Sequence, residues 1–226
     1  MGLSYENAYY IHVPYDQEAE ELIIQNGKKR NIKAGEFLIK AGREVTSIHY
    51  LAAGTLVHYA LNDQGVEKVG YINTPGSFTN EFLFLTHGGH IIPKRFVMAR
   101  GDSIVYSIDR ECFDKIHQYP SFEKILMQSL YEKYRILRGE VDSLAFNSSQ
   151  QRLLKLFKAS MDRSNYTDKK EWIPLKITYT QQEMAAIIGV HRVSVARLIT
   201  NLCKSGYIRL INHKIEVHRR YMQEND

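Results

Sequence analysis

The spacing of hydrophobic residues divides the chain into three stretches. From about Gly27 to Ile108, apolar residues occur in short alternating or β-rich runs such as SIHYLAAGTLVHYAL and SIVYSI, with glycines between them. Short strands with regular turn signals predict an antiparallel barrel, sandwich or roll, with no helix longer than a turn or two. A hairpin tip is predicted at Leu61–Gly65, where Asn, Asp and Gly supply turn conformations.

A longer period begins at Ser121. In SFEKILMQSLYEKYRILRGEVDSLAF the apolar positions step by four, four, three, four and three residues, a near-heptad spacing with charges between. The stripe consists of Leu126, Leu130, Tyr134, Leu137, Val141 and Leu144. It predicts a long helix that pairs with a second copy of the chain. The alternative is a stripe that packs only on its own domain.

A polar segment, NSSQQR (Asn147–Arg152), ends the stripe and predicts a hinge. A further helix is expected in QQRLLKLFKASM, followed by a polar loop, DRSNYTDKKEW. The next stretch, TQQEMAAIIGVHRVSVARLITNL, begins with the capping-box spacing of Thr180 and Glu183. Gly189 stands where a tight turn needs a positive φ. Two short helices around one glycine turn are typical of a helix-turn-helix.

The second of these helices is expected from about Arg192 to a C-terminal cap at Gly206. Its predicted buried residues are Val195, Leu198, Ile199 and Leu202. After it, YIRLINHKIEVH predicts a β-hairpin wing around Asn212 and His213. The alternative is an ordinary antiparallel helix pair with a solvated outer face.

The outer face of the second helix carries side chains suited to DNA. Arginine donates to guanine or phosphate, serine reaches phosphate, and valine offers an apolar contact to a thymine methyl. The residues expected to contact DNA are Thr180, Gln181, His191, Arg192, Val193, Ser194 and Arg197.

Charge is distributed unevenly along the chain, which has a formal net charge of +5. Residues 147–226 hold 14 Lys and Arg against 7 Asp and Glu, whereas residues 1–146 hold 16 against 18. A basic region beside a near-neutral one indicates a polyanion-binding module attached to a second module.

Several classes of protein are not indicated by the sequence. No run approaches the roughly 18 apolar residues of a membrane span, and the N-terminus lacks the pattern of a signal peptide. Cys112 and Cys203 form neither a disulfide nor a metal framework, so we expect two reduced thiols in a cytoplasmic protein without a cofactor. Motifs of metalloproteases, hydrolases and phosphate loops are missing, so we expect no enzyme and no catalytic or metal-binding residue.

The stretch TQQEMAAIIGVHRVSVARLITNLCKSGYI resembles the DNA-binding motif of the Crp/Fnr family of bacterial transcription regulators. The resemblance covers nearly the whole chain and implies an α+β fold. Its parts would be an N-terminal antiparallel β-roll of the cyclic-nucleotide-binding type (residues 1–120), a long dimerisation helix (121–146) and a C-terminal winged helix-turn-helix (147–226). The implied partners are double-stranded DNA, a small-molecule effector, RNA polymerase and a second copy of the chain.

Two residues depart from the common family pattern. His191 stands where a serine is common, and Val193 stands where many members have a glutamate that accepts a hydrogen bond from cytosine. Because valine cannot accept that bond, a G·C pair facing residue 193 is not favoured. We therefore expect an AT-rich palindrome as the operator, and activation as the family's commoner outcome.

The effector is less well specified. In the cyclic-nucleotide version of the roll, a Gly-Glu pair and an Arg-Ser pair hold the ligand, whereas Asn80-Glu81 and Pro93-Lys94 stand here. The alternatives that stay open are a cyclic nucleotide, ligand-independent DNA binding, and haem. Haem would use a histidine from the set His49, His58, His87 and His90. Two cysteines are too few for a four-cysteine iron–sulfur cluster.

The recognition stretch GVHRVSVAR is similar to a branch of the family that controls reductive dehalogenation genes in response to ortho-halogenated phenols. This resemblance places Lys133 on the branch's phenolate-contacting lysine and Tyr71 on a pocket tyrosine. The branch's second pocket lysine aligns with Glu81, a charge reversal that disfavours a phenolate unless Glu81 points away. The alternative for Lys133 is a solvent-facing position. The expected effector-binding residues are Tyr71, Asn80, Glu81, Leu130, Lys133 and Tyr134.

Overall fold

The computed structural model describes residues 9–63, 65–86, 90, 92–162 and 171–222. Contacts between Cα atoms divide them into two compact units. The β-roll unit comprises residues 9–62 and 69–139, and the C-terminal unit comprises the remaining described residues, 140–222 together with the short segment 63–68. The polar loop predicted before Trp172 lies mostly outside the described residues, as does His87.

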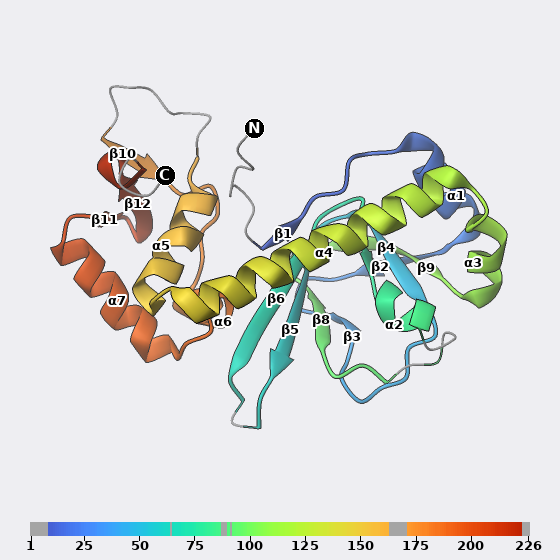
Figure 1. Cartoon of the computed structure of the whole chain (residues 1–226), viewed down its shortest axis with the longest axis horizontal. Coiled ribbons are helices and arrows are strands. Elements are labelled where there is room, and N and C mark those ends of the chain that lie inside the picture. Colours follow the sequence, from blue (N-terminus) through green and yellow to red (C-terminus); the bar gives the residue numbers. More distant parts are fainter. Residues whose placement is uncertain (1–8, 64, 87–89, 91, 163–170, 223–226) are drawn as a thin grey trace. The chain divides into compact units, whose positions relative to one another are not determined.

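Two sheets form the β-roll (Figure 1). The first has the order β1 (Tyr10–Ile11), β6 (Glu67–Asn73), β5 (Leu56–Leu61), β8 (Phe96–Ala99) and β3 (Phe37–Ile39). The second has the order β2 (Lys28–Ile32), β9 (Ser103–Ile108), β4 (Ile48–Ala53) and β7 (Phe78–Thr79). The short pair β1–β6 is parallel, which is an exception to the antiparallel expectation. The predicted hairpin tip is confirmed, since β5 and β6 are neighbours joined through Gly65, whose φ is +74°.

Strand β4 of the second sheet is buried on both faces over its first four residues. One face of β4 contributes Leu51 to an apolar cluster with Leu56 and Val97 of the first sheet. The other face contributes Ile48 and Tyr50 to a larger cluster with helices. This explains why β4 is buried at four successive positions instead of alternating between buried and exposed.

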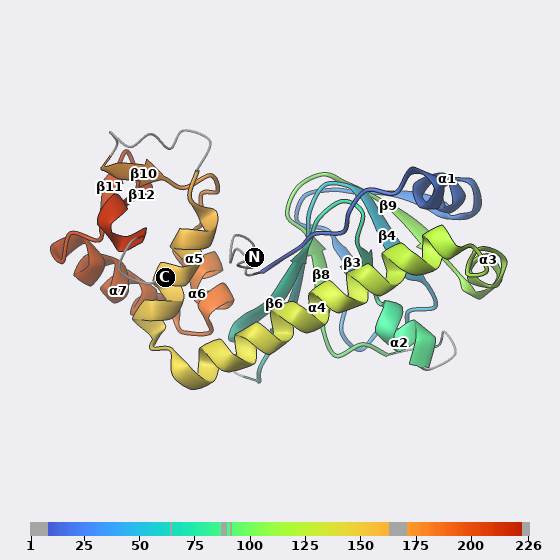
Figure 2. The ribbon, with the colours of Figure 1, turned by 45° about the horizontal axis from the view of Figure 1, so that its top comes forward.

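The described residues of this unit form four helices: α1 (Gln17–Asn26), α2 (Glu81–Thr86), α3 (Arg110–Ile116) and most of α4 (Pro120–Phe146). The sequence interpretation did not include α1 or α3, although Asp16 and Asp109 cap them by accepting hydrogen bonds from Ala19 N and Cys112 N. Figure 2 shows α1 and α3 at the same end of the roll, and the short α2 agrees with the expectation of no long helix between the strands.

Helix α4 buries one side on the roll. Phe122, Ile125, Leu126 and Ile136 belong to the larger apolar cluster, and each is at most 3% exposed. Since Leu126 is 2% exposed within its own unit, it has no surface left for a second chain, and its assignment to the dimerisation stripe was wrong. The later stripe residues are exposed: Tyr134 60%, Leu137 41%, Val141 65% and Leu144 48%.

The C-terminal unit contains the predicted helices and hairpin. Its elements are α5 (Ser149–Ser160), β10 (Trp172–Pro174), α6 (Gln181–Ile188), α7 (Arg192–Lys204), β11 (Ile208–Ile211), β12 (Lys214–His218) and a 3₁₀ turn (Arg219–Met222). Its sheet has the order β10-β12-β11. Among the described residues no single helix is long and apolar enough to span a membrane; only α6 and α7 taken together, bent by 101°, meet that measure.

Candidate DNA-binding surface and buried polar cluster

The first helix of the predicted helix-turn-helix begins at a reciprocal cap. Glu183 N donates to Thr180 Oγ1 (3.1 Å), and Thr180 N donates to Glu183 Oε2 (2.8 Å). Thr180 is exposed, and Gln181 begins the helix. The capping box read from the sequence is therefore confirmed, and it defines where α6 starts.

Gly189 ends α6 in the left-handed conformation, with φ 71° and ψ 49°. Its N–H and that of Val190 both donate to Ala185 O, at 2.9 and 3.1 Å, which closes the helix. The chain then turns into α7, and the two helices are bent by 101°. This angle lies in the range of about 90–120° that helix-turn-helix motifs adopt.

The second helix buries one face and exposes the other. Val195, Ile199 and Leu202 are 0–7% exposed, whereas Leu198 is only half-buried, in partial disagreement with the prediction. The exposed side carries Arg192, Arg197 and Val193, the last 63% exposed.

Among the other residues expected to contact DNA, His191 caps α7 through its backbone. The carbonyl of His191 accepts from Ser194 N at 2.9 Å, while its side chain makes no cap hydrogen bond and is exposed. Ser194 is half-buried. The positive N-terminal end of α7 therefore lies beside exposed imidazole and guanidinium groups, an arrangement that suits an anion such as phosphate.

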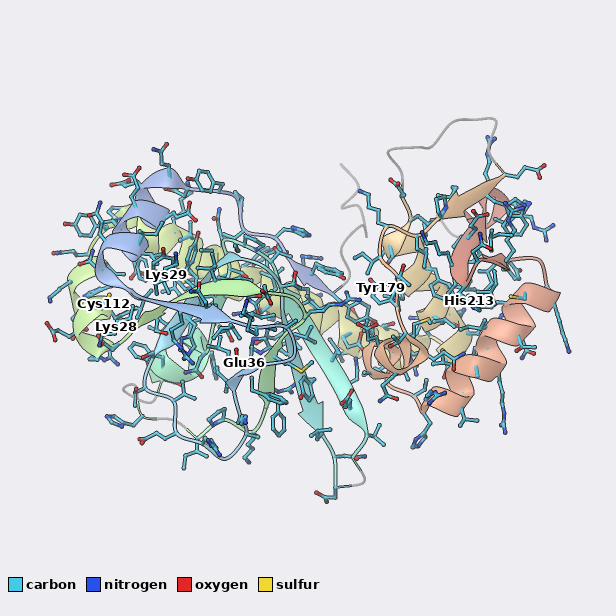
Figure 3. All side chains as sticks on the ribbon, turned by 180° about the vertical axis from the view of Figure 1, so that it is seen from behind. Lys28, Lys29, Glu36, Cys112, Tyr179 and His213 are labelled. Atoms are coloured by element: carbon cyan, nitrogen blue, oxygen red, sulfur yellow. The ribbon has the colours of Figure 1, made fainter. Side chains whose placement is uncertain are left out.

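The wing is a tight hairpin. Asn212 and His213 both have positive φ, 49° and 62°, as a two-residue type I′ turn requires. Figure 3 labels His213 at this turn and Tyr179 on the segment that leads into α6. Both residues line a pocket of about 190 Å³, together with Gln181 at the start of α6 and Lys214 of the wing. The wing and the start of α6 thus lie side by side, and Gln181, His213 and Lys214 are among the polar members of a largely apolar lining.

A third strand supports the wing. Strand β10 pairs with β12, placing Trp172 opposite His218, with their rings 4.8 Å apart. The guanidinium of Arg209 lies 4.7 Å from the centre of the Trp172 ring and forms an ion pair with Glu216. These contacts hold the hairpin to the unit.

The β-roll unit contains a buried polar cluster centred on Lys133 of α4, which is 6% exposed. Its ammonium donates to the Glu81 carboxylate in a very short contact and to Phe78 O at 2.7 Å. Ser129, one turn earlier on α4, also donates to Glu81 (3.3 Å) and accepts from Phe78 N (3.1 Å). The alternative of a solvent-facing Lys133 is therefore wrong. Glu81 points toward Lys133, not away from it.

Two aromatic groups complete the cluster. The Lys133 ammonium lies 5.4 Å from the centre of the Tyr71 ring, which in turn lies 4.3 Å from the ring of His58. His58 Nε2 and Thr79 Oγ1 share a hydrogen bond of 2.6 Å. Burial lowers the pKa of His58 well below 6.5, helped by the nearby Lys133 charge. Burial also lowers the pKa of Lys133, which the Glu81 carboxylate opposes.

The remaining residues expected at the effector site are not all brought together. Asn80, with φ 71°, uses its side-chain amide to bind Ser47 O at 3.0 Å. Leu130 is half-buried, and Tyr134 is 60% exposed. Because adjacent helical residues point in directions about 100° apart, Tyr134 cannot share the buried direction of Lys133 within one chain. Tyr134 therefore lies outside the buried cluster of Lys133, and its assignment to an effector site beside α4 stays a prediction.

The histidines considered for haem have other environments. His49 is buried, with Nδ1 2.9 Å from Ser107 Oγ, and burial lowers its pKa to about 3. His90 is exposed beside Glu44 (2.8 Å). Among residues that the structure describes, no three His, Cys, Asp or Glu side chains are grouped as a metal would need. The thiol of Cys112, labelled in Figure 3, is buried on α3, and its pKa is raised by burial.

Sequence reasoning did not identify Ser129, His58 or Asn73 as partners in this cluster. Asn73 is fully buried and donates through Nδ2 to Phe78 O (2.6 Å) and Ser77 Oγ (2.7 Å). Of these three residues only Ser129 has a signal in the sequence, because it lies four residues before Lys133 on the same helix.

Comparison with known proteins connects both units to defined families. Residues 151–222 match the Crp-like helix-turn-helix domain, and residues 29–119 match the cyclic nucleotide-binding domain. The fumarate and nitrate reduction regulatory protein of Escherichia coli K12 is 23% identical over 184 residues, which are 80% of this chain and 71% of that protein. Its namesake in Vibrio cholerae is 22% identical over 196 residues, 82% and 76% of the two chains.

Solved structures share the fold. The c-di-GMP responsive global regulator CLP of Xanthomonas campestris has a TM-score of 0.77 at 16% identity, covering 90% of this chain and 99% of its own. CprK complexed with OCPA has a TM-score of 0.71 at 17% identity, covering 94% and 96%. The matched domains confirm the predicted architecture of a cyclic-nucleotide-binding β-roll with a C-terminal helix-turn-helix.

Proposed function

We propose that the chain is a transcription regulator of the Crp/Fnr family that binds a palindromic operator as a homodimer under the control of a small organic effector. The observation that carries this proposal is the helix-turn-helix itself. Its second helix presents Arg192, Val193 and Arg197 outward, and the wing turn contributes His213 and Lys214. In helix-turn-helix proteins the second helix lies in the major groove, where its arginine side chains can contact base edges and the phosphate backbone.

Dimerisation is supported by the second half of α4. Tyr134, Leu137, Val141 and Leu144 are 41–65% exposed and follow a near-heptad spacing. A contiguous apolar stripe of this kind is unfavourable in water and is typical of an interface. Two copies joined here would present two recognition helices to half-sites about 34 Å apart.

The operator follows from residue 193. Because the Val193 side chain offers only methyl groups, we propose A·T or T·A at the base pair that it faces, within an AT-rich palindrome. Selection of binding sites from random DNA with the full chain tests this, and enrichment of G·C at that step contradicts it. In the Val193→Glu variant a carboxylate can accept from cytosine N4. We expect G·C to gain about 1–3 kcal/mol at that base pair alone.

The effector is proposed to bind beside α4 in the β-roll unit, near the polar cluster of Lys133, Glu81 and Tyr71. An ortho-halogenated phenol is one candidate, from the branch resemblance and from the solved complex of CprK with o-chlorophenolacetic acid. A phenolate would have to replace the Glu81 carboxylate at the Lys133 ammonium, since that contact is already made within the chain. An uncharged effector meets no such competition.

Ligand-independent DNA binding is a second candidate, and the same ion pair favours it, because Lys133 needs no external anion to be neutralised. Gel-shift affinity for the selected operator, measured with halogenated phenols, cyclic nucleotides and no addition, distinguishes the two. A change of affinity with one compound supports effector control. The same affinity under every condition supports the ligand-independent alternative.

Activation by recruiting RNA polymerase is the outcome that we propose for the bound dimer. In vitro transcription from a promoter carrying the selected operator tests it. A rise in transcript with added protein is expected, and a fall would indicate repression.

A further inference from the structure

We propose that Arg152 is a positioning residue that holds the recognition helix at a fixed angle to the end of α4. It ends the polar segment Asn147–Arg152 and lies in the first turn of α5, where Ser148 and Gln151 form a capping box. Arg152 is only 9% exposed, whereas Lys155, also on α5, is exposed. The inference rests on the proposed DNA binding.

The guanidinium of Arg152 joins two helix ends. Its Nε donates to Ile188 O (2.9 Å), the last residue of α6, and its Nη1 donates to Asn147 O (2.9 Å), directly after α4. A third donor, Nη2, reaches Ser149 Oγ at 3.5 Å. All four residues belong to the C-terminal unit.

Both carbonyls are groups that a helix leaves without an internal partner at its C-terminus. The last turns of α4 and α6 contain no basic residue of their own. A single buried cation therefore meets the negative ends of two helices. The planar guanidinium fixes the directions of its donors, which a lysine ammonium does not.

The contact to α6 is made at the corner of the helix-turn-helix. Ile188 precedes Gly189, whose left-handed conformation turns the chain into α7 three residues later. Fixing the Ile188 carbonyl to the end of α4 therefore fixes the direction from which α7 departs. Since two recognition helices must meet half-sites at one separation, freedom at this corner lowers affinity for the correctly spaced operator.

The test uses the full chain and two DNAs, the selected palindrome and the same palindrome with two base pairs added at its centre. The variant Arg152→Gln should weaken binding to the palindrome about tenfold, which corresponds to about 1.4 kcal/mol. It should also reduce the preference for the correct spacing. A variant that only lowered the folded fraction would weaken binding to both DNAs equally and leave that preference unchanged.

Lys155→Gln is the matched control, because it removes the same charge from the exposed side of α5. We expect it to keep the wild-type preference for spacing. Arg152→Gln should also keep the wild-type dependence of affinity on salt, since a buried guanidinium contacts no phosphate. A spacing preference in Arg152→Gln equal to that of Lys155→Gln would overturn the proposal. A fall in its salt dependence would instead make Arg152 a phosphate contact.

Far-UV circular dichroism checks that Arg152→Gln is folded. If it is not, Arg152→Lys decides, because it keeps the charge but reaches fewer acceptors at once. A partial loss of spacing preference in Arg152→Lys is expected, and full wild-type preference would overturn the proposal. If selection with the wild-type chain recovers no bound DNA sequence, the proposed function itself is overturned. If the wild type binds normally and the Arg152 variants behave like it, only the role of Arg152 is overturned.

Discussion

Buried ionisable side chains are the residues whose behaviour the sequence predicted least. Lys133 and Tyr134 are neighbours, yet one is 6% exposed and the other 60%. The charge of Lys133 is neutralised by Glu81, which lies 52 positions earlier in the chain. No local pattern links two residues so far apart, because their contact depends on how α2 and α4 pack. His49 and His58 of the roll are buried as well, at 4% and 5% exposed.

Acid should destabilise the roll through these histidines. The folded pKa of His49 is about 3 and that of His58 is well below 6.5, so the unfolded state binds protons first as pH falls. Their stabilising contribution is complete above pH 6.5 and is lost as pH decreases below it. We expect a loss of roughly 1 kcal/mol for each histidine between pH 6.5 and 5.5, measured by urea unfolding. The variant His49→Gln should show a smaller loss over that range; an unchanged loss would contradict the assignment.

Removing Lys133 should be costly because Glu81 would remain as a buried, uncompensated carboxylate. We expect Lys133→Met to lower the free energy of unfolding by about 3 kcal/mol or more. Urea unfolding of Lys133→Met, Glu81→Leu and the double variant provides the measurement. The double variant should be more stable than Lys133→Met alone, and costs that simply add would show that the two side chains are not coupled.

At the scale of elements, short-range signals were sufficient for the C-terminal unit. The capping box of Thr180 and Glu183 and the left-handed Gly189 act within a few residues, so the sequence alone predicted where α6 begins and ends. Helix α4 was predicted in extent but not in its faces. Leu126 lies at the edge of the stripe nearest to the side that packs on the roll, and the roll covers it. Spacing alone cannot tell which part of a stripe another domain covers.

The exposed half of α4 can be tested with a pair of glutamates. Val141→Glu places a charge in the proposed interface and should shift the chain from dimer to monomer in sedimentation experiments. Gly139→Glu places the same charge on the opposite side of the helix, where an added Cβ meets no atom within 4 Å. We expect it to stay dimeric and to gain roughly 0.5–1 kcal/mol from replacing a helical glycine. Dimers of equal strength in both variants would place the interface elsewhere.

At the scale of the whole molecule, the basic excess is confined to the residues after 146. Operator affinity should therefore fall steeply with salt, through contacts in the C-terminal unit only. Arg197→Gln on the exposed face of α7 should reduce the slope of log affinity against log salt by about 1 for each phosphate that the arginine no longer neutralises.

Lys29→Gln on β2 of the roll (Figure 3) removes the same charge from an exposed position. We expect its salt slope to equal that of the wild type, measured by filter binding over a range of potassium chloride concentrations. A smaller slope for Lys29→Gln would mean that DNA also contacts the roll.

Trp172 has a practical consequence for all of these measurements. It is the only tryptophan in the chain, and it lies on β10 between Arg209 and His218 of the wing hairpin. Excitation of the indole should therefore report on the C-terminal unit alone, without a label. We expect DNA contact with the wing to change the stacking and charge around the indole, so its emission should follow operator binding in the unmodified protein.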